Sequence, residues 1–171
     1  MARHKPIMGI ENEFKLLRVG IEVSGTEYFQ PWVEKLAIPY FKKSPSCVRL
    51  ATGGSFYIDG MEPEVTTAPF YLEPGSVTSL ASNLFLSIDA VIDALHKINK
   101  KGVPGLGLYL NGYSAHYNFT FPEIASQHQQ IAYLLATTVN PALQLFTENR
   151  KSGGMMFRYR ELDRLELCAD Y

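Results

Sequence analysis

The sequence has 171 residues, of which 46% are hydrophobic and 12% aromatic, which is enough apolar chain to bury the core of one domain. Its formal net charge is -1, with no basic stripe, and this balance argues against nucleic acid as a partner. No apolar run near the N-terminus is long enough for a signal peptide or a membrane span, so no membrane partner is expected.

Strands dominate the first part of the chain. Residues 7–17 form a short apolar and acidic run that predicts a strand, whereas residues 30–43 are predicted as a helix. Residues 48–67 are predicted to run strand, turn, strand, with breaks at Gly53 and Gly54 and again over residues 60–63.

The clearest predicted element is a long helix over residues 76–101, where apolar residues recur at three- and four-residue steps. Residues 107–121 alternate as a strand does, and residues 124–148 return to a helical pattern. Residues 155–171 are predicted to form a hairpin of two strands.

Strands separated by long helices indicate the α+β class, with a mixed or antiparallel sheet covered by helices on one face. We therefore predict a single domain over residues 1–171, whose other sheet face is free to carry a site. The two cysteines, Cys47 and Cys168, are too few and too isolated for a disulfide framework or a cysteine-based zinc site, which favours a reducing, cytoplasmic location.

The first acidic pair lies in the predicted strand that opens the chain. Side chains alternate along a strand, so Glu11 and Glu13 share one side of it. Two neighbouring carboxylates repel each other, and a hard divalent cation such as Mg²⁺ relieves that repulsion. On this spacing alone, a solvated polar face is the commoner explanation of such a pair.

A second acidic set follows in the predicted 48–67 hairpin. Tyr57 and Asp59 lie on the side opposite the apolar Phe56 and Ile58, and the turn then presents Glu64. A hairpin with acidic residues at its mouth is common. Carboxylates beside an apolar strand, however, favour a cation or donor partner.

The predicted strand over residues 107–121 carries its polar residues on one side. Ser114, His116, Asn118 and Thr120 share this side, and Ala115 and its apolar neighbours share the other. A lone histidine is more often structural, but the amide and hydroxyls beside it suit contacts with phosphate oxygens or a metal site.

Two arginines share a face of the last hairpin. Arg158 and Arg160 offer the planar donor groups that bind phosphate or carboxylate. A cross-strand ladder of ion pairs with Glu166 and Arg164 explains them equally well.

Three of these segments together resemble the Pup ligase and Pup deamidase family, which is related to glutamine synthetase-like carboxylate-amine ligases. Residues 9–14 match its Gly-Ile-Glu-x-Glu-Phe/Tyr strand, and residues 57–67 resemble its Tyr-x-Asp strand followed by Pro-Glu and small hydroxyl residues. Residues 114–118, Ser-Ala-His-Tyr-Asn, are similar to its Gly-Cys-His-Glu-Asn stretch. Where the family has a histidine before Pro-Glu, this chain has Glu62.

The resemblance implies a curved, mostly antiparallel sheet and a site for ATP and Mg²⁺. It makes Glu11, Glu13 and Glu64 metal ligands, and Asp59 the catalytic aspartate. The resemblance also makes Tyr57, His116 and Asn118 contacts of the nucleotide. The strand pattern adds Arg158 and Arg160 as further candidates for binding its phosphates.

The activity that the resemblance implies is an ATP-dependent ligation of a carboxylate to an amine through an acyl phosphate. The partners would be a peptide, protein or small-molecule carboxylate and an amine. A deamidase using the same pocket and a non-catalytic binding domain are the alternatives. Because the likeness covers mainly residues 7–121, we expect the N-terminal part of a larger catalytic domain, completed by a further segment or by self-association.

Overall fold

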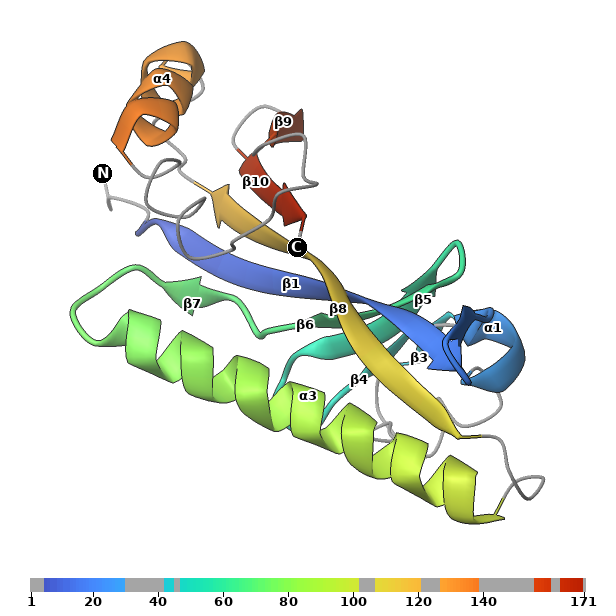
Figure 1. Ribbon diagram of the computed structural model, residues 1–171. Helices are drawn as coiled ribbons and strands as arrows, with labels where there is room; N and C mark the ends of the chain where they lie inside the picture. Colours follow the sequence, from blue (N-terminus) through green and yellow to red (C-terminus); the bar gives the residue numbers. More distant parts are fainter. Residues whose placement is uncertain are drawn as a thin grey trace.

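The structure is a computed structural model that describes residues 5–29, 42–44, 47–101, 107–120, 127–138, 156–160 and 164–170. These residues form an antiparallel sheet of ten strands with the long helix α3 (Ser76–Lys101) lying across one face (Figure 1). The predicted α+β class, with a mostly antiparallel sheet and a helix packed on one face, is confirmed.

Eight strands follow one another across the sheet, and two short strands pair with the two ends of β1. The order is β3 (Lys42–Ser44), β4 (Cys47–Arg49), β5 (Ser55–Asp59), β6 (Glu62–Thr66), β1 (Ile7–Arg18), β8 (Leu108–Thr120), β10 (Arg164–Asp170), β9 (Met156–Arg160). The short strands β2 (Ile21–Glu22) and β7 (Phe70–Tyr71) both pair with β1. The remaining described helices are α1 (Gly25–Tyr28) and α4 (His128–Thr138).

The two longest strands, β1 and β8, lie side by side at the centre of the sheet. They pair from Ile7 opposite Thr120 to Arg18 opposite Leu108, with one irregularity between Glu13 and Phe14. At about 3.3 Å per residue, a strand of 12 residues spans roughly 40 Å. Both strands therefore extend from the half of the sheet above α3 to the end where β9 and β10 join (Figure 1).

Helix α3 packs on the sheet because its apolar stripe meets the inward residues of the strands. Val91 and Leu95 of the helix lie in one core cluster with Leu16, Phe56 and Val65 of the sheet. Such a stripe at three- and four-residue spacing is what an amphipathic helix presents to a core.

Two asparagines of α3 also tie the helix to the backbone of the sheet region. Asn83 donates to the carbonyl of Thr52 at 2.8 Å and accepts from the N–H of Ala68 at 3.0 Å. Asn99 makes the same two kinds of bond with Leu108, at the start of β8. These bonds satisfy backbone groups where the strands begin or end.

Most of the predicted elements agree with the structure. The strand over 7–17, the helix over 76–101, the strand over 107–121 and the terminal hairpin are confirmed as β1, α3, β8 and the β9–β10 pair. The helical prediction for 124–148 overlaps α4, and the rest of that range lies outside the described residues except for a turn at Gln127.

Two predictions need correction. The helix predicted over residues 30–43 includes Lys42 and Lys43, but these two residues belong to the edge strand β3. The rest of that range, residues 30–41, lies outside the described residues. The 48–67 segment contains three strands instead of two, and Pro63 lies inside β6, where it is buried. A proline such as Pro63 favours a turn, but in the structure Pro63 is buried within β6 and lies beside Gly25 of α1.

Helix α3 is also long and apolar enough to cross a membrane when judged by length and composition alone. Its most apolar 18-residue window has a mean hydropathy of 1.3, and 22% of that window is buried inside the structure. Core helices of soluble proteins meet the same two criteria, so this finding does not by itself assign the helix to a membrane.

Candidate functional site

The sheet face opposite α3 carries the polar residues. Val65 points into the core beneath the sheet, and because side chains alternate along a strand, Glu64 and Thr66 point to the other face. On that face lies a cleft of about 470 Å³. Among its lining residues are eight that the sequence singled out: Glu11, Glu13, Tyr57, Asp59, Glu64, His116, Asn118 and Arg158.

The strand register brings residues that are far apart in sequence to neighbouring places. Glu13 of β1 lies opposite Glu64 of β6, and Glu64 lies in turn opposite Tyr57 of β5. On the other side of β1, Glu11 lies opposite His116 of β8. Directly opposed residues have Cβ atoms about 4.5–5.5 Å apart, so the side chains of these segments lie close together in two adjacent rows, Glu13-Glu64-Tyr57 and Glu11-His116.

His116 is buried among three carboxylates, of which Glu166 is also buried and Glu11 and Glu13 are partly buried. Its Nδ1 is 3.3 Å from Glu11 Oε2 and 3.4 Å from Glu166 Oε1, and its Nε2 is 3.4 Å from Glu13 Oε1. Burial alone would lower the pKa of His116, but hydrogen bonds to Cys168 and Glu11 and the charge of Glu13 raise that pKa to about 10. The imidazole is therefore a cation at neutral pH.

Glu64 holds a proton that a carboxyl group ordinarily loses. Burial raises its pKa, and a hydrogen bond to Glu11 together with the charges of Glu11, Glu13 and Asp59 raises it further, to about 9. For Glu11, burial raises the pKa, but hydrogen bonds to His116 and Glu64 outweigh it, so the pKa is lowered. Neighbouring carboxyls thus share protons because they cannot all be charged at once.

The pKa of Glu13 is also raised, which favours the neutral acid. Burial raises it, and the charge of Glu11 acts in the same direction, while the His116 cation opposes both. A group of carboxylates that cannot ionise fully without added positive charge is the electrostatic signature of a cation-binding site.

One polar atom in the cleft has no partner among the described residues. The side-chain oxygen Oδ1 of Asn118 is buried and accepts no hydrogen bond there. Buried polar atoms are nearly always satisfied, so this oxygen is free to contact a cation or a donor of a bound molecule. The oxygen-rich set fits Mg²⁺, which prefers carboxylate and carbonyl oxygens.

The position of Arg158 is compatible with both predictions made from the sequence, a cross-strand ion pair and a contact with a bound ligand. Its Nε lies 3.6 Å from Glu166 Oε2 on the paired strand, which makes a cross-strand ion pair, and Arg158 also lines the cleft. The side chain of Arg160 lies outside the described residues; the backbone of Arg160 pairs with Arg164, and the side chain of Arg164 lines the cleft.

The sequence reasoning missed two buried members of the site as functional residues. Glu166 had been considered only as an ion-pair partner, and Cys168 only in the count of cysteines. Glu166 lies opposite Asn118, and Cys168 lies opposite His116. The alternation of the last strand could have revealed them, because Arg164, Glu166 and Cys168 share a side. Which strand they face was not readable from the sequence.

No known family model matches the sequence, and no curated protein matches it. Among solved structures, the chain is similar to the ligase PafA in its complex with the prokaryotic ubiquitin-like protein Pup, with a TM-score of 0.50 and 17% sequence identity. The alignment covers 97% of this chain and 41% of that chain. At this identity the likeness shows the fold alone, so the chain has a Pup ligase-like fold and spans less than half of that ligase.

Proposed function

We propose that this chain carries the acidic half of an ATP- and Mg²⁺-dependent carboxylate-amine ligase site. The observation that carries the proposal is the cluster of Glu11 and Glu13 on β1 with Glu64 on the neighbouring strand β6, in which burial and the adjacent acids raise the pKa of Glu64 to about 9. Acidic groups held this close favour a divalent cation as their partner. The Pup ligase-like fold supports the same chemistry.

In this proposal, Glu11, Glu13 and Glu64 hold Mg²⁺, and His116, Asn118, Tyr57 and Arg158 contact the phosphates of ATP. Bound Mg²⁺ supplies positive charge that neutralises the phosphates during transfer. The unpartnered Oδ1 of Asn118 and the exposed part of Arg158 support these roles, because both groups line the cleft and can accept or donate further hydrogen bonds.

Asp59 is the proposed catalytic base. It lies at the exposed end of β5 and lines the cleft, so an incoming amine can reach it. The carboxylate substrate first takes the terminal phosphoryl group of ATP and releases ADP. The amine then attacks the acyl phosphate, Asp59 accepts a proton from the nitrogen, and phosphate leaves as the amide forms.

The proposed substrate is the carboxylate of a peptide or protein. The fold neighbour is a ligase in complex with a small protein, which supports a macromolecular substrate over a small one. Because this chain spans 41% of that neighbour, a further segment or a second copy is proposed to complete the nucleotide site.

The test is calorimetric titration of ATP in the presence of Mg²⁺ and in the presence of a chelator. We expect binding only with Mg²⁺. Glu64→Gln should weaken that binding at least tenfold because the substitution removes the negative charge that the carboxylate offers to the cation. Glu73→Gln is the matched control, since Glu73 is exposed and pairs with Lys5 outside the cleft. Equal affinity with and without Mg²⁺ would contradict the proposal.

Turnover distinguishes a ligase from a site that only binds ATP. With ATP, a carboxylate-bearing peptide and hydroxylamine as the amine, a ligase forms ADP and a hydroxamate. Asp59→Asn should abolish hydroxamate formation and leave ATP binding within about twofold, since the residue acts on the amine and not on the nucleotide. Loss of ATP binding in Asp59→Asn would assign the residue to the nucleotide instead.

A further inference from the structure

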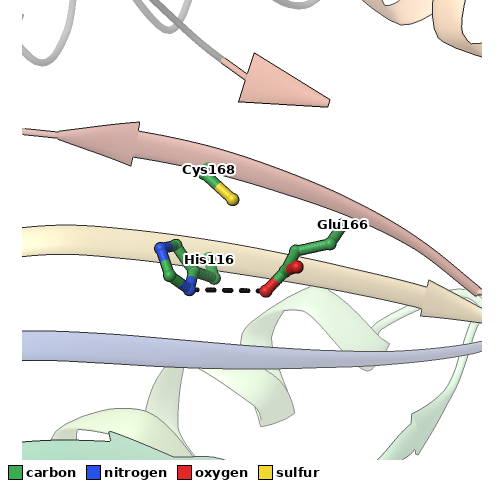
Figure 2. A group of neighbouring side chains, drawn as sticks. All are labelled: His116, Glu166 and Cys168. Atoms are coloured by element: carbon green, nitrogen blue, oxygen red, sulfur yellow. Dashed lines mark ion pairs between the residues drawn. The ribbon is translucent and has the colours of Figure 1, made fainter. Parts of the chain in front are cut away.

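On the paired strands β8 and β10, at one side of the cleft, three buried side chains of different chemistry meet. His116 of β8 lies directly opposite Cys168 of β10, and Glu166 lies two residues along the same strand (Figure 2). One ligand atom from each residue lies within 4.8 Å of the other two, and all three residues are buried. They supply a nitrogen, a sulfur and an oxygen.

We propose that His116, Glu166 and Cys168 bind a zinc ion at the β8–β10 side of the cleft, beside the Mg²⁺ site proposed for Glu11, Glu13 and Glu64. Zn²⁺ accepts imidazole, thiolate and carboxylate in one tetrahedral shell, at about 2.0–2.3 Å from each ligand atom. Mg²⁺ binds thiolate poorly and prefers oxygen. The cysteine therefore decides which metal this cluster selects.

The spacing of the cluster already approaches that of a zinc shell. Two ligands on a tetrahedral zinc ion lie about 3.3–3.8 Å apart, given those bond lengths. His116 Nδ1 and Glu166 Oε1 are 3.4 Å apart, which is within this range (Figure 2). Cys168 Sγ lies within 4.8 Å of the ligand atoms of the other two residues.

The cluster needs one further ligand, and a water molecule can take this fourth position. Glu11 Oε2 lies 3.3 Å from the same imidazole nitrogen, so the zinc ion and the proposed Mg²⁺ would be neighbours. Arg158 donates from Nε to Cys168 Sγ at 3.0 Å and would have to move aside. Its side chain is 38% exposed and can turn towards the solvent.

The zinc site would change how the cleft is used. Zinc bound to Nδ1 of His116 would leave Nε2–H as the nitrogen that can still donate to a phosphate, so the metal would fix the tautomer of this proposed phosphate contact. The inference does not depend on the proposed ligase activity, because it rests on the buried cluster and not on ATP.

The test uses Co²⁺ as a spectroscopic substitute for Zn²⁺, added to the purified chain without nucleotide. We expect a thiolate-to-cobalt charge-transfer band in the near ultraviolet and the intense visible bands of tetrahedral Co²⁺, both lost when Zn²⁺ is added. Cys168→Ser should abolish the charge-transfer band. Cys47→Ser is the matched control, since Cys47 lies on β4 in another part of the sheet, and it should keep the band.

Two further variants keep the inference falsifiable if Cys168→Ser unfolds the protein. His116→Gln and Glu166→Gln should each weaken Zn²⁺ binding at least tenfold, with folding checked by circular dichroism. The absence of a thiolate band in the wild-type protein, or its loss in Cys47→Ser, would overturn the zinc site. Mg²⁺-dependent ATP binding without that band would leave the proposed function standing, whereas the band without ATP binding would remove that function alone.

Discussion

At the scale of single residues, the site is a set of acids and one cation that hold each other in unusual protonation states. Glu64 has a pKa of about 9 and His116 a pKa of about 10, compared with ordinary values of 4.5 and 6.5. Both pKa values are raised in the folded protein, so the folded state binds more protons than the unfolded chain. The stability that these groups contribute is complete below their ordinary values and is lost as the pH rises through the raised ones.

The free energy of unfolding should therefore fall between pH 6.5 and pH 9, where both groups act in the same direction. Glu64→Gln removes one of these titrations because an amide resembles the protonated acid. At pH 8 and without Mg²⁺, we expect the variant to be about 1–2 kcal/mol more stable than the wild-type protein. Urea unfolding at several pH values measures both effects, and a variant as pH-dependent as the wild type would contradict the assignment of the proton.

The same substitution connects stability to function. Glu64→Gln should stabilise the metal-free protein while weakening Mg²⁺-dependent ATP binding. Active sites commonly keep such unfavourable charge because the ligand relieves it.

At the scale of elements, the long helix α3 and the long strands β1 and β8 hold the site in place. The helix covers one face of the sheet, and the cleft lies on the other, so each strand residue serves either the core or the site. The positions of Glu64 and Val65 illustrate the division, because the two neighbours point to opposite faces of β6.

Two leucines of α3 allow a matched test of this packing. Leu95 is 4% exposed in the core cluster, whereas Leu86 is 59% exposed on the outer side of the same helix. Leu95→Ala should lower the free energy of unfolding by about 2–5 kcal/mol through the cavity that it leaves. Leu86→Ala should change it by less than about 0.5 kcal/mol. Chemical denaturation of both variants measures the difference, and equal losses would contradict the packing of α3 on the sheet.

At the scale of the whole molecule, the chain is a sheet of ten described strands covered by one long helix, with the acidic cleft on the opposite side. The cleft is formed by β1, β5, β6, β8, β9 and β10, so it draws on both ends of the described chain. A cation held by Glu11, Glu13 and Glu64 would connect the neighbouring strands β1 and β6 and would favour the folded state.

Mg²⁺ should for this reason raise the melting temperature. At ten times the dissociation constant, a ligand that binds only the folded state adds about 1.4 kcal/mol, which corresponds to a shift of roughly 3–6 °C for a chain of this size. Differential scanning fluorimetry at pH 8 with MgCl₂, and with NaCl at matched ionic strength, measures the shift. We expect Glu13→Gln to reduce it, and an equal response to both salts would argue against a specific site.

The sequence by itself determined the α+β class, the helix over 76–101 and which side chains share a face, because alternation along strands and the spacing along a helix are local properties. Only the tertiary structure decided which faces meet. The strand order β6-β1-β8-β10 places Glu64, Glu11, His116 and Glu166 on neighbouring strands around one cleft, and no local pattern specifies that order. The role of Cys168 became visible only when β10 paired with β8, since a ligand cluster depends on contacts between segments that lie far apart in the chain.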